Sequence, residues 1–122
     1  MRLGKIIPIL RMFDEAKARE FYVDFLGFAV DWEHRFEPDL PLYMQISKDD
    51  CLIHVSGHFG DGSPGAHLRI ETRGLDEYQQ SLLAKQYKHS RPGIEEQPWG
   101  TRDMTISDPF GNAITFWEEG TK

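Results

Sequence analysis

Apolar and polar residues alternate along several short stretches of this chain, which is the pattern of a β-strand with one buried face. The strands predicted in this way are Phe28–Glu33, Leu42–Ser47, Cys51–Ser56, His67–Thr72, Thr101–Ser107 and Asn112–Glu118. An isoleucine-rich run, Lys5–Leu10, predicts a further strand, and Pro8 favours an edge position for it because proline cannot donate a backbone hydrogen bond. A short strand is also predicted over Tyr87–Ser90.

A helical period replaces the alternation in two places. The first helix is predicted from Asp14, as its N-cap, to Phe25, with Gly27 as the C-cap glycine. Its buried face consists of residues three and four apart, namely Ala18, Phe21, Tyr22 and Phe25. The second helix is predicted to begin near Asp76, with a buried face formed by Leu75, Tyr78 and Leu82.

The order of these elements repeats along the chain. The first strand and helix begin at Lys5 and Asp14, and the pattern restarts at His67 and Asp76, an offset of 62 residues in both cases. The sequence therefore predicts an α+β chain of two β-α-β-β-β modules, about 1–57 and 66–122, joined by a glycine-rich linker at about 57–65. Each module alone has a small core, so we expect them to form a single domain, 1–122, within one chain or with a second copy.

Composition limits the classes of partner. The chain has 14 basic and 20 acidic residues, a net charge of −6, which argues against nucleic acid and tolerates a cationic ligand. A mild acidic excess also serves solubility alone. The lone Cys51 excludes an intramolecular disulfide and a cysteine-based zinc site. No apolar run approaches the roughly 20 residues that span a bilayer, and no signal peptide is recognised, so we expect no membrane partner and a cytoplasmic location.

Familiar catalytic motifs do not occur. The five histidines form no HxH or HExxH arrangement, and there is no nucleophile elbow. The glycine-rich stretch 57–65 precedes a strand instead of a helix, which argues against a phosphate loop.

The last two predicted strands form a hairpin preceded by an isolated tryptophan. Their connection is Asp108-Pro109-Phe110-Gly111, in which proline presets one φ angle and glycine accepts a positive one. Just upstream, Pro98 and Gly100 bracket Trp99. The ring of Trp99 either closes the end of the sheet or offers a stacking surface to a ligand.

With these elements in place, the chain resembles the vicinal oxygen chelate superfamily, which contains glyoxalase I, extradiol dioxygenases, fosfomycin-resistance enzymes and bleomycin resistance proteins. The segments that carry the resemblance are Pro8-Ile-Leu, Ala18-Arg-Glu-Phe-Tyr, Phe25-Leu-Gly-Phe28, Arg73-Gly-Leu-Asp-Glu77, Glu96-Gln-Pro-Trp-Gly-Thr-Arg102 and Asp108-Pro-Phe-Gly-Asn112. The segment Glu96–Arg102, with Arg73–Glu77 upstream, resembles the bleomycin resistance branch in particular.

The resemblance implies paired βαβββ modules with half-open sheets, in a homodimer that exchanges strands or modules. In the bleomycin resistance branch it also implies sequestration of a cationic, ring-bearing glycopeptide drug in crevices at the dimer interface, without catalysis and without a cofactor. Trp99 matches the tryptophan that stacks on the planar rings of the drug in that branch, and Phe36 is the expected opposing aromatic residue.

The enzymes of the superfamily hold a divalent metal, and only one of three matching positions can ligate here. The first-strand position falls at Ile7 and the last-strand glutamate position at Thr115, whereas His67 matches a usual histidine ligand. No metal site is therefore predicted, with His67 as a weak candidate. The alternative is a metal-dependent lyase or dioxygenase in which other side chains, such as His54, Gln45 or Glu118, complete a different site.

Aromatic and acidic residues suited to binding lie at predicted strand ends and loops. A flat ring can stack on the aromatic side chains, and carboxylates favour a cationic group. The expected ligand-binding residues are Trp99, Phe36, Trp32, Phe59, Asp31, Glu33, His54 and Arg102. Alternation alone leaves open whether Trp32, Tyr43 and Trp117 are core residues instead. A module for a different hydrophobic metabolite or for a protein partner is a third reading.

Overall fold

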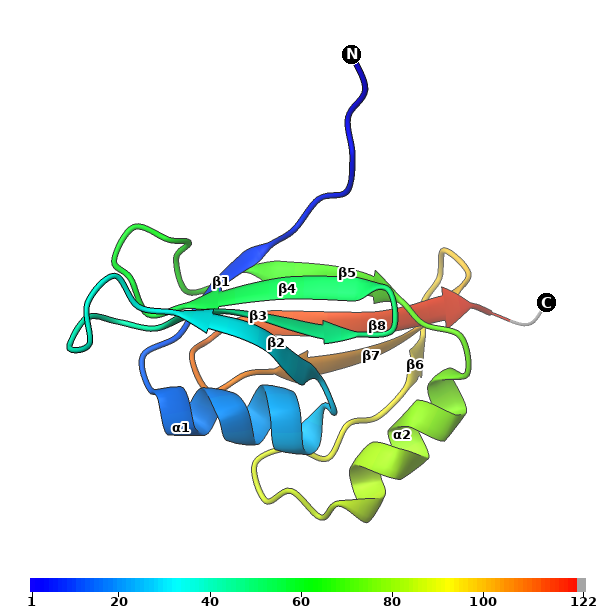
Figure 1. Ribbon diagram of the computed structural model, residues 1–122. Coiled ribbons are helices and arrows are strands. Elements are labelled where there is room, and N and C mark those ends of the chain that lie inside the picture. The colour runs from blue at the N-terminus through cyan, green and yellow to red at the C-terminus, as the bar shows by residue number, and fades with distance from the viewer. Residues whose placement is uncertain (121–122) are drawn as a thin grey trace. The chain divides into compact units, whose positions relative to one another are not determined.

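The computed structural model describes residues 1–120 and divides between Pro64 and Gly65 into two compact units (Figure 1). We call them unit 1 and unit 2. The predicted linker from residue 57 onward belongs almost entirely to unit 1. Residues 121 and 122, at the end of the predicted second module, lie outside the described residues.

Unit 1 has one helical segment and a mixed four-stranded sheet. Its elements are β1 (Ile9–Arg11), α1 (Glu15–Ala18), η1 (Arg19–Phe25), β2 (Ala29–His34), β3 (Tyr43–Lys48) and β4 (Cys51–Ser56). The strand order is β1-β4-β3-β2, with β1 parallel to β4 and the other pairs antiparallel.

Unit 2 repeats this topology. Its elements are β5 (His67–Glu71), α2 (Leu75–Ala84), β6 (Glu95–Glu96), β7 (Thr101–Ser107) and β8 (Ala113–Glu119). The order is β5-β8-β7-β6, again with the first strand parallel to the last. The predicted α+β fold with two βαβββ modules is therefore confirmed.

Equivalent hydrogen bonds correct the predicted offset between the modules. The backbone N–H of Met12 donates to the carbonyl of Ser56, and that of Thr72 donates to the carbonyl of Trp117. These donors, and the N-cap positions Asp14 and Gly74, are each 60 residues apart, not 62. The first strand was placed too early, and the start of the second helix was placed two residues after its N-cap, Gly74.

The predicted strand Lys5–Leu10 was wrong in its bounds, because only Ile9–Arg11 pairs with β4. Pro8 still contributes a carbonyl oxygen that accepts from the N–H of His54 at 2.9 Å, and β1 lies at the edge of its sheet, as the proline predicted. The segment before β1 extends away from that strand (Figure 1).

The predicted strand Tyr87–Ser90 was also wrong. These residues form a turn closed by a hydrogen bond from the N–H of Ser90 to the carbonyl of Tyr87. The second strand of unit 2 is instead the two-residue β6, which pairs with β7. No long apolar alternation marks so short a strand, so the pattern could not reveal it.

The first helix forms as its sequence predicts. The side chain of Asp14 accepts from the backbone N–H of Lys17 at 2.9 Å, which satisfies one of the free donors of the first turn. The helix widens from α into π geometry at Arg19 and ends before Gly27, whose φ is 87°. All four residues of the predicted apolar face are buried: Ala18, Phe21, Tyr22 and Phe25.

Strand alternation separates an apolar face from a polar face in each sheet. The apolar residues Met44, Ile46, Ile53 and Val55 of unit 1 are fully buried, and the helix of that unit lies along one side of its sheet (Figure 1). In unit 2 the apolar face of β7 and β8 meets α2, where the rings of Tyr78 and Phe116 pack edge to face at 5.1 Å. Polar side chains are left on the opposite face of each sheet.

The β7–β8 turn is locked by one carboxylate. Asp108 Oδ1 accepts from the backbone N–H groups of Phe110 and Asn112, both at 2.8 Å, and Asp108 Oδ2 accepts from Asn112 Nδ2 at 2.9 Å. Gly111 has the positive φ, 91°, that the sequence predicted. Asn112 Oδ1 also accepts from the N–H of Ala66, which ties the turn to the start of β5.

The glycine-rich stretch packs against β1. A Cβ on Gly62 would lie only 2.7 Å from the carbonyl oxygen of Ile9, so glycine is required there by close backbone approach. The side chain of Asp61 in the same stretch accepts from Ser56 Oγ at 3.0 Å. Composition predicted a flexible linker, but its central residues are held by the edge of the sheet.

Within residues 1–120, no helix combines the length and the apolar character needed to cross a membrane.

Candidate functional site

The polar face of the unit 1 sheet carries an aromatic cluster formed by Trp32, Tyr43 and His54. The rings of Trp32 and Tyr43 are nearly parallel, at 10° and 6.0 Å. The imidazole of His54 meets both edge to face, at 5.2 Å from Trp32 and 5.1 Å from Tyr43. Trp32 keeps 42% of its surface exposed, so the cluster is open to solvent and is not part of the core.

A chain of hydrogen bonds continues from this cluster across the sheet. Tyr43 Oη lies 2.6 Å from His54 Nδ1, and His54 Nε2 lies 3.0 Å from Gln45 Oε1. Gln45 Nε2 donates to Asp31 Oδ2 at 3.0 Å, and Ser47 Oγ donates to Asp31 Oδ1 at 2.9 Å. Each polar group of this row therefore has a defined partner.

Burial sets the charge states at the centre of the row. It lowers the pKa of His54, which keeps the imidazole neutral at pH 7. It also raises the pKa of the Tyr43 hydroxyl, with a smaller contribution from the Asp61 carboxylate. The cluster thus presents neutral rings with carboxylates nearby.

A β-bulge brings Asp31 and Trp32 to the same side. In the β2–β3 ladder Val30 pairs with Ile46 and Trp32 pairs with Gln45, so Asp31 is an extra residue without a partner position. Regular alternation would have placed these two side chains on opposite faces.

Glu33 lies away from the cluster, because regular alternation resumes after Trp32. Glu33 pairs with Met44, which faces the helix, and its carboxylate forms an ion pair with Arg19. Of the two predicted acidic residues on this strand, only Asp31 joins the aromatic cluster.

Phe36 and Phe59 lie on loops beside the sheet and are highly exposed, at 70% and 95%. The ring of Phe36 meets His34 and His58 edge to face, at 4.6 and 5.5 Å. The guanidinium of Arg11 lies 6.0 Å from the ring of Phe59 and 4.8 Å from that of Phe13. Both predicted aromatic residues are therefore surface groups with aromatic or cationic neighbours.

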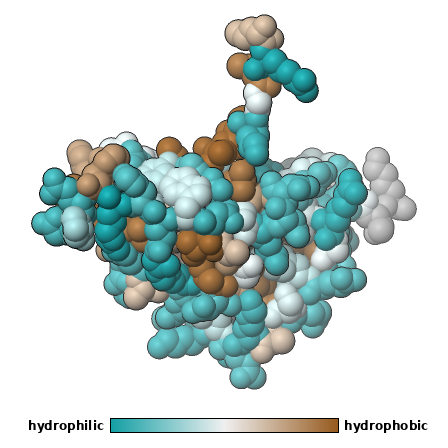
Figure 2. Space-filling model, viewed as in Figure 1, coloured by the Kyte–Doolittle hydropathy of each residue, from teal (hydrophilic) through white to brown (hydrophobic). Residues whose placement is uncertain are grey.

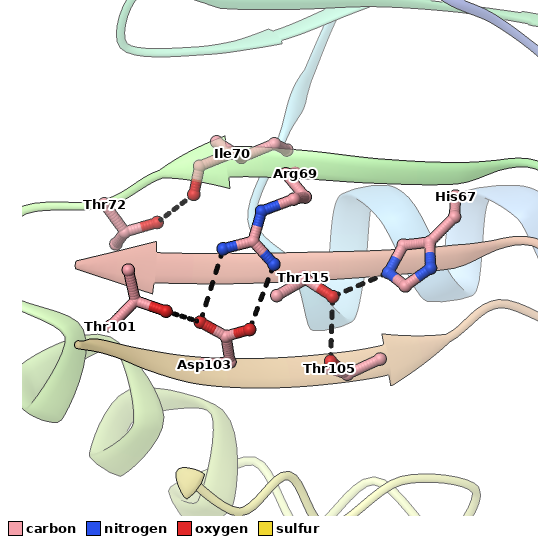
Figure 3. Close-up of polar contacts among 8 residues, drawn as sticks. All are labelled: His67, Arg69, Ile70, Thr72, Thr101, Asp103, Thr105 and Thr115. Atoms are coloured by element: carbon pink, nitrogen blue, oxygen red, sulfur yellow. Dashed lines mark hydrogen bonds and ion pairs between the residues drawn. The ribbon is translucent and has the colours of Figure 1, made fainter. Parts of the chain in front are cut away.

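The polar face of unit 2 carries two hydrogen-bonded groups (Figure 3). In the first, His67 Nε2 lies 2.7 Å from Thr115 Oγ1, which lies 2.8 Å from Thr105 Oγ1. In the second, Arg69 donates through both terminal nitrogens to Asp103, at 3.0 and 3.4 Å, and Thr101 Oγ1 donates to the same carboxylate at 2.8 Å.

The ion pair of the second group is partly buried. Asp103 is 7% exposed, and the Arg69 guanidinium lowers the pKa of its carboxyl group, with help from Thr101. The guanidinium of Arg69 also lies 5.6 Å from the ring of Trp117. Trp117 is therefore half-buried on the polar face, beneath an arginine.

The side chains around His67 do not fit a divalent metal. One imidazole and two threonine hydroxyls are a poor ligand set, because carboxylate, imidazole and thiolate groups provide most protein ligands for such ions. Within the described residues, no three His, Cys, Asp or Glu side chains gather in a way that could hold a metal ion. Of the other side chains considered as ligands, Glu118 is engaged by Arg102 at 2.6 Å.

Trp99 lies at the tip of the β6–β7 loop with 65% of its surface exposed. The loop is closed by hydrogen bonds from Gln97 N–H to the Thr101 carbonyl and from Gly100 N–H to the Gln97 carbonyl, at 2.8 and 3.0 Å. Gly120 N–H donates to the carbonyl of Gly100 at 2.7 Å and braces the loop from the end of β8. The backbone that carries Trp99 is therefore held by hydrogen bonds, and its ring is exposed.

Arg102 is turned to the other face of its strand. It donates to both oxygens of Asp76 at 2.9 Å and to Glu118 Oε1 at 2.6 Å, and these contacts raise the pKa of its guanidinium. This residue joins α2 to β7 and β8 instead of standing beside Asp103. Arg102, the last residue of the segment Glu96–Arg102 that resembles the bleomycin resistance branch, therefore forms structural ion pairs.

Sequence reasoning did not select Tyr43, Ser47, Arg69, Asp103 or Thr105 as site residues. Tyr43 and Ser47 belong to an alternating stretch in which Met44 and Ile46 are apolar. The signal that could have found them is that the polar residues of two adjacent strands must share one face.

The arrangement of two mixed sheets, each with its helix between the first and second strands, is the glyoxalase/bleomycin resistance fold. The model of the family described as "Glyoxalase superfamily protein" matches residues 1–121. The chain therefore belongs to the glyoxalase, or vicinal oxygen chelate, superfamily, near its bleomycin resistance branch.

Curated relatives place it near that branch. Bleomycin resistance proteins of Geobacillus stearothermophilus and Staphylococcus aureus are each 28% identical over 127 residues, covering 93% of this chain and 95% of the relative.

Solved structures agree on the fold. A bleomycin-binding protein complexed with bleomycin matches with a TM-score of 0.71 at 18% identity, over 96% of this chain and 99% of that one. An antibiotic-binding protein, TnmS3 from Streptomyces sp. CB03234, matches with a TM-score of 0.72 at 21% identity, over 98% and 99% of the two chains.

Proposed function

We propose that the protein binds and sequesters a cationic, aromatic-ring-bearing small molecule of the bleomycin type, without catalysis. The observation that carries this proposal is Trp99, a ring that is 65% exposed and yet held by a closed, braced loop. Exposing a large apolar ring is unfavourable unless a partner covers it, and a ring carried on a fixed backbone stacks on a planar ligand with less loss of backbone entropy.

The polar face of unit 1 carries acidic charge beside aromatic rings of its own. Asp31 lies beside the Trp32–Tyr43–His54 cluster, and Asp61 is close enough to influence Tyr43. Neutral aromatic rings together with carboxylates favour a cation through Coulomb and cation–π attraction, each of about 1 kcal/mol at an exposed site. The names of the curated relatives and of the complexed structure support bleomycin as the probe.

The absence of catalysis is part of the proposal and rests on Thr115. Its hydroxyl stands where the enzymes of the superfamily carry a glutamate, and it is engaged by His67 and Thr105. A neutral hydroxyl in a hydrogen-bonded pair offers little to a divalent ion.

We further propose that the protein works as a homodimer with the drug held in crevices at the dimer interface. The segment before β1 supports an exchange of chain between protomers, because Leu3 and Ile6 are 84% and 92% exposed. Apolar side chains stand out along this segment (Figure 2). Light scattering should give the mass of two chains, and removal of residues 1–6 should shift the equilibrium toward one chain.

Isothermal calorimetry with metal-free bleomycin tests the binding proposal. We expect a dissociation constant in the micromolar range or tighter, with one drug molecule per chain, in buffer containing a chelator. Trp99→Ala should weaken binding at least about tenfold, since aromatic stacking and burial of a tryptophan contribute more than about 1.4 kcal/mol. Absence of heat at drug concentrations well above micromolar would refute the proposal.

A further inference from the structure

The direction of the hydrogen bonds on the unit 1 face can be worked out from Asp31. An ionised carboxylate only accepts, so the group of Gln45 that contacts Asp31 Oδ2 at 3.0 Å must be the NH₂ group. The amide oxygen of Gln45 therefore points to His54 Nε2, 3.0 Å away. That oxygen is an acceptor, so His54 Nε2 must carry a hydrogen.

This assignment fixes the other side of the imidazole. A neutral ring with a hydrogen on Nε2 has a bare lone pair on Nδ1. Tyr43 Oη, 2.6 Å from Nδ1, must then donate its only hydrogen to the ring. The two remaining lone pairs of Tyr43 Oη can then only accept hydrogen bonds.

The surroundings of Tyr43 suit a positively charged donor. The indole of Trp32 lies parallel to the Tyr43 ring and is 42% exposed, and the carboxylates of Asp31 and Asp61 lie on the same side. Arg11 also projects from this side, but its guanidinium is turned to the rings of Phe13 and Phe59.

We propose that Tyr43 Oη and the face of Trp32 form a subsite for a protonated primary or secondary amine, and that Asp31 and Gln45 are positioning residues that make Tyr43 an acceptor. The ammonium donates one N–H to Tyr43 Oη while its charge lies over the indole. This subsite deepens the proposed function, on which it rests for the identity of the natural ligand. The tests of the subsite use NMR of His54 and small cationic probes in place of the drug.

The first test reads the tautomer of His54 directly. Long-range ¹H–¹⁵N spectra of protein labelled in histidine should show His54, assigned with a His54→Asn variant, carrying its hydrogen on Nε2. Asp31→Ala frees the amide of Gln45 to rotate and should give a mixture of tautomers. Ser47→Ala removes the other contact of Asp31 and should leave the Nε2–H form intact.

The second test compares two probes of equal charge. Benzylammonium can donate N–H groups, whereas benzyltrimethylammonium cannot. Binding of each probe is followed by the shift of the indole N–H resonance of Trp32. We expect benzylammonium to bind about threefold to tenfold more tightly than benzyltrimethylammonium, because one hydrogen bond separates the two probes. In Tyr43→Phe the preference should disappear.

Three results would overturn the inference. They are a His54 ring protonated on Nδ1 in the unaltered protein, an Nε2–H tautomer that Asp31→Ala does not disturb, and equal or tighter binding of the quaternary probe. None of them depends on bleomycin, so failure of the proposed function and failure of this subsite are distinguishable.

Discussion

His67 Nε2 lies 2.7 Å from the hydroxyl oxygen of Thr115, the residue that the resemblance matches to the last-strand glutamate of the metal-dependent enzymes. We predict that protein purified without chelator contains far less than one divalent metal ion per chain. We also predict that a chelator leaves the binding of metal-free bleomycin unchanged, because no ligand residue depends on a metal. Elemental analysis and calorimetry check these points. Stoichiometric metal that disappears in His67→Ala would contradict the prediction.

The hydrogen bond from Gly120 N–H to the Gly100 carbonyl, which supports the loop of Trp99, gives a second prediction. A Cβ on Gly120 would lie 2.7 Å from the carbonyl oxygen of Gly100, so Gly120→Ala must displace the loop. We expect bleomycin binding to weaken about tenfold, which corresponds to about 1.4 kcal/mol, while the protein stays folded. Gly93→Ala is the matched control, because an added Cβ there meets nothing within 4 Å. Equal affinities of the two variants would show that the brace does not position Trp99.

The Arg69–Asp103 pair predicts a pH dependence of stability. Arg69 lowers the pKa of Asp103 below its ordinary value of 3.8, so the pair contributes stability that is complete above pH 3.8 and is lost as the pH falls through the lower folded-state pKa. Arg69→Met should destabilise the protein by about 1 kcal/mol at pH 7, since Arg69 is half-exposed.

The same substitution should flatten the stability profile below about pH 3.8, because without Arg69 the folded-state pKa of Asp103 returns toward its ordinary value. Urea unfolding between about pH 2.5 and about pH 7 measures both effects. Asp103→Asn should remove this part of the pH dependence. An unchanged profile in Arg69→Met would contradict the assignment.

The β7–β8 turn predicts a large effect of one side chain. Asp108 is 7% exposed and accepts from Phe110 N–H, Asn112 N–H and Asn112 Nδ2. Asp108→Ala removes the carboxylate that accepts from these three donors and should cost about 2–4 kcal/mol. Chemical denaturation checks the value. The exposed Asp50, in the β3–β4 turn, is the control, and its replacement by Ala should cost less than about 0.5 kcal/mol.

Local patterns were sufficient for most of the fold. The bounds of β4 and β7 were predicted without error, and the N-cap Asp14 and the turn glycine Gly111 adopt the predicted roles. The first strand was misplaced because pairing with β4, not apolar character, decides where it begins. β6 was missed because two residues are too few to show alternation.

The site was harder to predict because it depends on which face each side chain takes. The bulge at Asp31 puts Asp31 and Trp32 on one side, and a strict two-residue period excludes that arrangement. Glu33 and Arg102 were predicted as ligand contacts from the sequence. Strand alternation places each side chain on the face opposite to the polar clusters, where Glu33 pairs with Arg19 and Arg102 pairs with Asp76. Trp99 could be found from its Pro98 and Gly100 neighbours alone, since these restrict the backbone locally.

The central claim is that Trp99 is a platform for the ring system of a cationic drug. The most direct measurement is ¹⁹F NMR of protein labelled with fluorotryptophan, in which a Trp99→Phe variant assigns one of the three tryptophan resonances. Saturation with metal-free bleomycin should shift or broaden the Trp99 resonance. A Trp99 resonance that stays unchanged while calorimetry shows the drug bound would contradict the claim.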